Sequence, residues 1–353
     1  DGHNLTEVAK AYQKASLVKD VPVMIIAKTI KGKGLSFLED QDNWHGKALS
    51  QDKLQEALLE LGDINISVKG EISYPEDLKV SAIEEKNIDL NKYLIKPVKK
   101  HLATRKAYGN AITKLGAKNQ KIVVLDAEMS NSTFANIFAA AFPDRFFEMF
   151  IAEQNMVSVS VGLAKMGKIP FVSTFASFLT RAFDQIRMAQ YSQANIKFIG
   201  SHAGVSIGQD GPSQMGLEDI SMLRSIRDSV VLYPSDAVST EKLVQQMANH
   251  KGISYLRTTR VDTPIIYKLD EEFKIGGSKV IYQSKKDVAT VIAAGITLHE
   301  AMKAYRQLRK NKINIRVIDL YSIKPLNVET LMKSAQETKA LVTAEDHYQF
   351  GGI

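Results

Sequence analysis

The stretch 150-FIAEQNMVS-158 places a single carboxylate, Glu153, where an apolar run gives way to a segment of helical period. The preceding residues 146–151 are mostly aromatic or aliphatic, and an aromatic-rich loop follows at 171–183. A carboxylate at a helix start is ordinarily a cap or a partner of the helix dipole. Because a Gln and an Asn adjoin it and aromatic residues follow, Glu153 is also a candidate for chemistry. The pattern predicts a helix that begins at this carboxylate.

Outward from this stretch, short apolar runs alternate with segments of helical period, which is typical of parallel strands joined by crossover helices. We expect strands at 23–27, 121–126, 170–174, 197–200, 230–233, 254–257, 289–293, 315–319 and 341–343. We expect helices at 104–115, 153–166, 181–192, 239–248 and 298–310. Before the fourth helix, Pro234, Ser235 and Asp236 supply a stop and a cap. The predicted fold class is α/β, with layered parallel-sheet domains followed by a partial α/β domain at the C-terminal end.

Two changes of composition suggest domain boundaries. Residues 63–100 are polar and poorly periodic, so they read as a linker. A second join is expected near 267–279, which contains a charged run and two adjacent glycines. The predicted division is therefore 1–62, linker 63–100, central domain 101–270 and partial domain 271–353.

Composition excludes several classes of protein. No apolar run approaches the length of a membrane span, and no signal peptide is visible, so we expect no membrane partner. The absence of cysteine excludes disulfides and Cys-ligated metals and fits a reducing compartment, so we expect a cytoplasmic protein. The 46 basic residues exceed the 39 acidic ones but are scattered among them, so we expect no nucleic-acid partner.

Four segments together resemble transketolase, a family of thiamine diphosphate enzymes. They are KGKGLSFLEDQDNWHGK (31–47), AEQNMVS (152–158), PFVSTFASFLTRAFDQIR (170–187) and GSHAGVSIGQDGPSQM (200–215), in the family's order. The resemblance covers nearly the whole chain and identifies the predicted pieces as a remnant of the diphosphate-binding domain, a pyrimidine-binding domain and a partial C-terminal domain. It also implies a cytoplasmic homodimer with active sites between subunits, acting on sugar phosphates in the pentose phosphate pathway. The reaction implied is reversible transfer of a two-carbon ketol unit from a ketose phosphate of the xylulose 5-phosphate type to an aldose phosphate.

The resemblance assigns residues to the cofactor, thiamine diphosphate. Glu153 matches the family's catalytic glutamate, which lies beside N1′ of the aminopyrimidine ring. Phe178 matches the residue that packs on that ring, although an aromatic series at this spacing is ordinarily core. Gln214 stands where many microbial members carry His, which is the animal-type pattern. The remaining cofactor candidates are Lys31, His45 and Phe175, and His45 is also assigned to catalysis and to substrate.

The substrate assignments follow from the same match. Phosphate is bound best by planar arginines, and Arg105 and Arg260 match the family's phosphate positions. His202 is expected at the end of a strand, where α/β folds place ligands. Each of these residues alone would ordinarily be an ion pair, a cap or a turn. The full substrate-binding set is His45, Arg105, Ser132, His202, Asp210 and Arg260.

The family binds Mg²⁺ through a Gly-Asp-Gly motif and a downstream Asn, and neither motif occurs here. The chain begins at Asp1 and stops at Ile353 within a glycine-containing loop. We therefore expect a fragment truncated at both ends, with no complete metal site and no activity by itself. The alternatives are another thiamine diphosphate enzyme, such as a deoxyxylulose-phosphate synthase or a pyruvate dehydrogenase component, and a non-catalytic transketolase-like protein.

Overall fold

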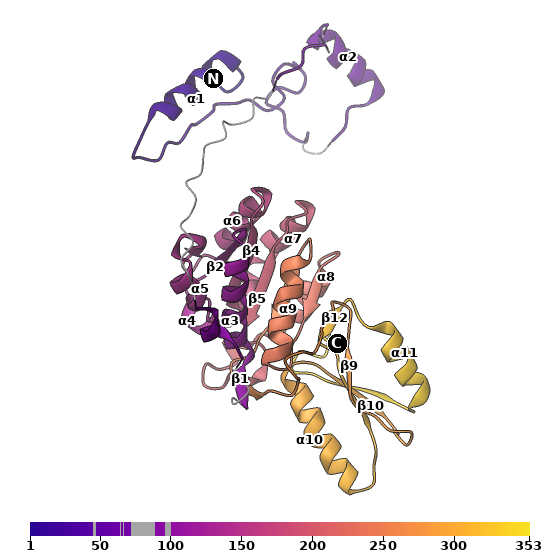
Figure 1. Ribbon diagram of the computed structural model, residues 1–353. Helices are drawn as coiled ribbons and strands as arrows, with labels where there is room; N and C mark the ends of the chain where they lie inside the picture. The colour runs from indigo at the N-terminus through magenta and orange to yellow at the C-terminus, as the bar shows by residue number, and fades with distance from the viewer. Residues whose placement is uncertain (45–46, 64, 66, 72–88, 96–99) are drawn as a thin grey trace. The chain divides into compact units, whose positions relative to one another are not determined.

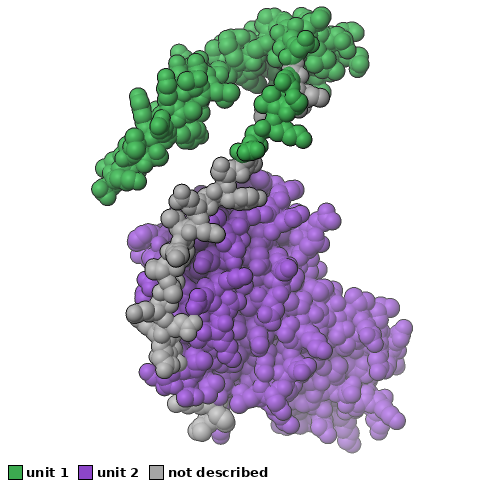
Figure 2. Space-filling view, turned by 45° about the horizontal axis from the view of Figure 1, so that its top comes forward, with its two compact units in different colours: residues 1–84 green, residues 85–353 purple. Residues whose placement is uncertain are grey.

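The computed structural model describes residues 1–44, 47–63, 65, 67–71, 89–95 and 100–353. The chain divides into two compact units, residues 1–84 and residues 85–353, shown in different colours in Figure 2. The units are described separately below.

The first unit contains two helices, α1 (Leu5–Leu17) and α2 (Gln51–Leu61). The Asn4 side chain caps α1 by accepting from two backbone N–H groups, and the Ser50 side chain caps α2 by accepting from Lys53 N. The prediction of a strand at 23–27 is wrong, because these residues form no strand. Met24 and Ile26 in this run are 85% and 87% exposed. A strand is defined by its pairing, and this apolar run has no ladder partner among the described residues.

The second unit is built on a seven-stranded sheet with the order β12-β6-β7-β5-β4-β2-β3. All neighbouring pairs are parallel except β12–β6, which is antiparallel. The strands are β2 (Ile122–Asp126), β3 (Phe146–Glu148), β4 (Ile169–Phe175), β5 (Lys197–Ser201), β6 (Val230–Leu232), β7 (Ser254–Arg257) and β12 (Ser322–Lys324).

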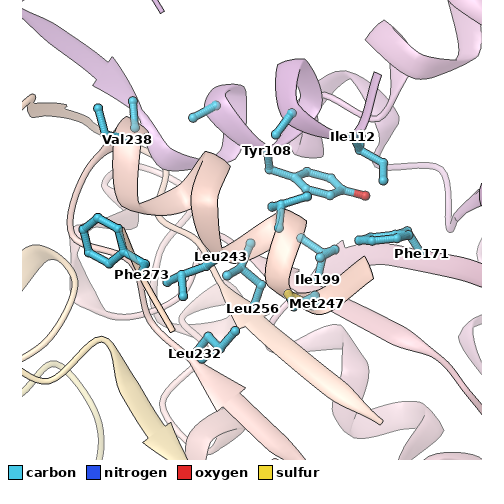
Figure 3. Packing of buried hydrophobic residues seen from close by; sticks show 14 of the residues in the cluster. Tyr108, Ile112, Phe171, Ile199, Leu232, Val238, Leu243, Met247, Leu256 and Phe273 are labelled. Carbon is cyan, nitrogen blue, oxygen red and sulfur yellow. The ribbon is translucent and has the colours of Figure 1, made fainter. Parts of the chain in front are cut away.

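Helices cover both faces of this sheet (Figure 1). One face carries α3 (Thr104–Lys118) and α9 (Ala237–Asn249), and the other carries α6 (Glu153–Lys165), α7 (Phe183–Tyr191) and α8 (Asp219–Ser225). Successive strand residues point to opposite faces, so Val124 packs in the α3/α9 core while its neighbour Val123 packs in the α6/α7 core. Figure 3 shows the first core, where Tyr108 and Ile112 of α3 lie over Phe171 and Ile199 of the sheet.

Shorter elements lie between these strands and helices along the chain. A two-stranded ladder pairs β1 (His101–Ala103) with β8 (Asp262–Pro264), which brings the start of α3 beside the chain that leaves β7. The remaining short pieces are α4 (Ser130–Thr133), α5 (Asn136–Ala141), η1 (Leu90–Tyr93), η2 (Pro143–Arg145), η3 (Phe178–Ala182), η4 (Val205–Ile207) and η5 (Pro212–Gln214).

A four-stranded sheet with the order β13-β10-β11-β9 forms the C-terminal part of this unit. Its strands are β9 (Lys279–Tyr282), β10 (Thr290–Ala293), β11 (Arg316–Asp319) and β13 (Leu341–Ala344), and its helices are α10 (Ile296–Lys310) and α11 (Val328–Glu337). Only β9 runs antiparallel to its neighbour. The same part of the chain donates β12 to the seven-stranded sheet, so the two sheets are tied by a shared segment.

The predicted α/β class is confirmed, and every strand expected from residue 121 onward is present within one or two residues. The predicted cap at Asp236 is also confirmed, because its side chain accepts from Ser239 N in a capping box. The predicted parallel strands make up most of both sheets, and each sheet also has one antiparallel edge strand, β9 or β12. Among the helices that the structure describes, none is both long and apolar enough to cross a membrane.

Candidate active site

Helix α6 begins at Glu153, as the sequence predicts. The Glu153 side chain is 2% exposed and does not cap the helix, so its carboxylate is free for another partner. That partner is Arg181 of η3, whose Nη1 donates to Glu153 Oε2 at 3.1 Å. Arg181 itself is largely exposed, so the pair has one buried and one solvated member. Sequence reasoning missed Arg181, although it lies three residues after Phe178, a spacing that places two side chains on one face of a helical turn.

An aromatic stack occupies the ends of β4 and β5. The rings of Phe175 and Phe178 stack with centroids 5.0 Å apart, and Phe175 also stacks on the imidazole of His202 at 3.9 Å. Phe175 is buried and Phe178 is partly exposed. Of the two phenylalanines, Phe178 is therefore the one that can offer a ring face to a ligand.

His202 directly follows β5 and adopts a positive φ of 56°, which is unusual for a residue other than glycine. Its Nδ1 lies 3.0 Å from Ser201 Oγ. Burial, and then the positive charge of Arg105, lower the pKa of His202 to about 4, although Asp210 opposes the shift. The imidazole is therefore neutral at pH 7 and can both donate and accept a hydrogen bond.

Two arginines lie beside this histidine. Arg105 Nε donates to the Arg260 carbonyl at 3.1 Å, and Arg105 Nη1 donates to the Ser132 carbonyl at 2.7 Å. The first turn of α3 is fixed there because Thr259 N donates to Thr104 Oγ1 at 3.0 Å. The predicted phosphate residues Arg105, Ser132 and Arg260 are thus brought together from three separate parts of the sequence.

The two arginines differ in their partners. Arg260 Nη1 pairs with Asp210 Oδ2 at 3.2 Å, whereas Arg105 donates to neutral carbonyls and has no carboxylate within ion-pair distance in the described parts of the chain. Burial and the charge of Arg260 both lower the pKa of Arg105. The carboxylates of Asp262 and Asp210 oppose this shift. Two neighbouring guanidinium groups, of which only Arg260 is ion-paired, form a site suited to an anion.

Asp126, the last residue of β2, stabilises the turn that carries Ser132 by hydrogen bonds. Its carboxylate accepts from Met129 N at 2.6 Å and from Thr133 Oγ1 at 2.7 Å. Burial raises the pKa of Asp126 to about 7 despite these two hydrogen bonds. This buried cap fixes the Ser132 carbonyl that Arg105 contacts.

Gln214 closes the set of predicted residues in this unit. It ends η5, its carbonyl accepts from Ser177 Oγ at 3.1 Å, and its side-chain Oε1 accepts from Ser213 Oγ at 2.6 Å. Ser177 immediately precedes Phe178, so the loop of Gln214 is tied to the aromatic stack.

Two further predicted residues, His45 and Lys31, do not belong to the described part of the second unit. His45 lies outside the described residues. Lys31 belongs to the first unit, where it is exposed and its carbonyl accepts from Asp40 N at 2.9 Å. Within the described ranges, no group of three His, Cys, Asp or Glu side chains could hold a metal ion.

Comparison with known proteins identifies the family. The chain matches three family models: transketolase, thiamine diphosphate binding domain, over residues 1–107; transketolase, pyrimidine binding domain, over 100–265; and transketolase, C-terminal domain, over 278–353. It is 49% identical to transketolase-like protein 2 of Mus musculus and 49% identical to the transketolase of Homo sapiens, in both cases over 100% of this chain. The chain spans 57% and 56% of the length of these two relatives.

A solved structure supports the same assignment. The structure titled "Split gene transketolase, inactive beta4 tetramer" is 42% identical with a TM-score of 0.65, and the match covers 71% of this chain and 82% of that one. The transketolase of Campylobacter jejuni has a TM-score of 0.62 at 20% identity, which shows a shared fold.

Proposed function

The chain belongs to the transketolase family, and on that premise we propose that a longer protein containing it transfers a two-carbon ketol unit between sugar phosphates. In this reaction the bond between C2 and C3 of a ketose phosphate, of the xylulose 5-phosphate type, is broken. The two-carbon piece joins the aldehyde carbon of an aldose phosphate, and the shortened donor leaves as an aldose phosphate. The transfer is reversible and involves no net oxidation. The pathway proposed is the pentose phosphate pathway.

The observation that carries this proposal is the convergence of His202, Arg105 and Arg260 at one edge of the sheet. The two guanidinium groups suit a phosphate dianion, because each donor on a planar arginine can reach a separate phosphate oxygen. Neutral His202, and Asp210 on Arg260, suit the sugar hydroxyls, which both donate and accept hydrogen bonds. We propose that Arg105, Ser132, His202, Asp210 and Arg260 bind the sugar phosphate.

The described residues also fit the aminopyrimidine end of thiamine diphosphate. Phe178 is partly exposed, and the buried carboxyl group of Glu153 can form a hydrogen bond to a ring nitrogen. When bound, this cofactor supplies the nucleophilic carbon that allows a carbon–carbon bond beside a carbonyl to be cleaved. We propose that Glu153 is the acid of this site, with Phe175, Phe178 and Gln214 as its walls. Lys31 and His45 are proposed to contact the cofactor, with His45 also contacting substrate and taking part in catalysis.

The proposed assembly is a homodimer in the cytoplasm with active sites between subunits. It is supported by two apolar side chains just before Glu153, Phe150 and Ile151, which are 68% and 67% exposed. Two adjacent apolar side chains left in water are stabilised when another chain covers them. The proposed domain division stays as 1–62, 63–100, 101–270 and 271–353.

We propose further that this 353-residue chain by itself does not catalyse the transfer. The sequence contains no Gly-Asp-Gly motif, so the Mg²⁺ that would neutralise the cofactor diphosphate lacks its expected ligands. The 42% identical relative whose structure is titled an inactive β4 tetramer offers a parallel.

Replacing Glu153 with Gln in the longer protein is expected to lower turnover about 100- to 10,000-fold, because the amide keeps the shape but cannot supply the proton. Cofactor affinity should stay close to that of the parent, since the packing on Phe178 is unchanged. Steady-state kinetics and a thiamine diphosphate titration measure the two quantities. Glu300→Gln, on the exposed side of α10, is the matched control. Turnover of the Glu153 variant within threefold of the parent would remove the assignment.

The phosphate assignment predicts a selective change in KM. Arg105→Ala and Arg260→Ala should each raise KM for phosphorylated sugars roughly 10- to 100-fold, because each loses charge-assisted hydrogen bonds worth about 1.5–3 kcal/mol. KM for hydroxypyruvate, which has no phosphate, should change little. Arg306→Ala on the exposed face of α10 is the control for removing a positive charge. An equal rise for both kinds of substrate would show that the two arginines act only on the fold.

Calorimetry of the 353-residue chain with thiamine diphosphate tests the proposed division of the cofactor site. We expect binding weaker than roughly micromolar and unchanged by Mg²⁺, because the pyrimidine side is present and the diphosphate ligands are not. Micromolar or tighter binding that depends on Mg²⁺ would contradict the proposal.

A further inference from the structure

A segment near the C-terminal end reaches underneath the loop that carries His202. Asp346, two residues after β13, is buried and its Oδ1 accepts from Arg257 Nη1 at 2.7 Å. Tyr233 OH donates to the same carboxylate at 3.1 Å. The two partners belong to the central domain, so Asp346 joins the C-terminal part of the chain to the seven-stranded sheet.

Arg257 lies at the centre of this contact. It ends β7 and its side chain is fully buried. Its Nε donates to Asp219 Oδ2 at 2.8 Å, and its Nη2 donates to the Gly216 carbonyl at 2.8 Å and to the Asp346 carbonyl at 3.0 Å. Burial opposes the positive charge, but Asp219 and Asp346 outweigh it and hold the pKa of Arg257 well above its ordinary value.

The network touches the His202 loop at two points. Gly216, whose carbonyl accepts from Arg257, also accepts from Gly204 N at 2.9 Å. The Asp346 carboxylate packs directly on Gly204, since a Cβ added there would lie 1.7 Å from Asp346 Oδ2. On the other side, Ala203 N donates to the Thr258 carbonyl at 3.2 Å, one residue beyond Arg257. The backbone just after His202 is therefore held by groups that depend on Arg257 and Asp346.

The residues that follow Asp346 hold it in place. His347 Nε2 accepts from Ser221 N at 3.4 Å, and Tyr348 N donates to the Leu217 carbonyl at 3.1 Å. Arg224 donates to the carbonyls of Gly351 and Gly352. These hydrogen bonds join the C-terminal segment to residues 217–224, which directly follow Gly216.

We propose that Asp346 is a positioning residue that holds the His202 loop through Arg257. It thereby couples the C-terminal part of the chain to the sheet edge where His202 lies. Its role in catalysis rests on the proposed function, because His202 is a substrate residue only under that proposal. The holding of the loop itself can be tested with no substrate or cofactor present.

Nuclear magnetic resonance of the ¹⁵N-histidine-labelled chain gives the test. The chain has 7 histidines, and the His202 signal is assigned as the one that His202→Gln removes. In the native chain this signal should not titrate between pH 8 and pH 5, because the pKa of His202 is about 4. In Asp346→Asn, Arg257 loses one of its two carboxylates and the loop loosens, so water reaches the ring. The His202 pKa should then rise toward its ordinary 6.5 and give a midpoint inside the window.

Three charged residues act on His202, namely Arg105, Asp210 and Arg260, and this variant changes none of them. A shift in the pKa of His202 would therefore come from a change in the loop. Asp319→Asn is the matched control, because Asp319 is also a buried carboxylate that joins the two parts of the unit. It accepts from Ser235 Oγ at 2.9 Å and from Tyr267 OH at 2.5 Å, and in the part of the chain that the structure describes it makes no hydrogen bond to the His202 loop. It should leave the His202 signal untitrated over the same range.

A folded Asp346→Asn chain whose His202 still does not titrate would overturn the proposal, as would an equal shift in Asp319→Asn. If circular dichroism shows that Asp346→Asn is unfolded, Tyr233→Phe decides, since it removes a single donor to the same carboxylate. The expected shift is then smaller and in the same direction, and its absence overturns the proposal. Failure of two-carbon transfer in the longer protein would contradict the proposed function and leave this result unaffected.

Discussion

The buried guanidinium of Arg257 is the constraint on which the loop after His202 depends. A buried charge that loses one partner typically costs about 3–5 kcal/mol, so each of its acceptors must stay in place. Those acceptors come from the first residue of α8, from the loop at Gly216 and from the segment after β13. One side chain therefore fixes two segments that are distant in sequence, residues 216–219 and the segment after β13, and the His202 loop lies directly against both.

Parallel strands explain why residues so far apart in the sequence share one site. Strands β2, β4, β5 and β7 run in the same direction, so their carboxyl ends meet at one edge of the sheet. Asp126 at the end of β2 supports the turn of Ser132, Phe175 ends β4, and His202 follows β5. Arg260 follows β7, and the β1–β8 ladder brings Arg105 to it. The edge thus gathers a ring surface, a neutral imidazole and two cations.

The sequence predicts local features of this arrangement well. The start of α6 at Glu153 and the cap at Asp236 are visible because both depend on neighbours within a few residues. The strand expected at 23–27 failed because apolar composition alone does not supply a pairing partner. The partners of Arg257 could not be predicted, since Asp219 and Asp346 lie 38 and 89 residues away and only the folded sheet brings them together. The pairing of Arg181 with Glu153 could not be predicted for the same reason, because the two residues are 28 positions apart in the sequence.

The choice of donor by the longer protein tests the central claim most directly. A site with two arginines at its proposed phosphate end and a neutral histidine beside them should accept a ketose phosphate. With xylulose 5-phosphate as donor and an aldose phosphate as acceptor, the account predicts release of glyceraldehyde 3-phosphate together with a ketose two carbons longer than the acceptor. Pyruvate should not be consumed. Release of carbon dioxide from pyruvate, with xylulose 5-phosphate left unchanged, would contradict the account and favour a different thiamine diphosphate enzyme of the same architecture.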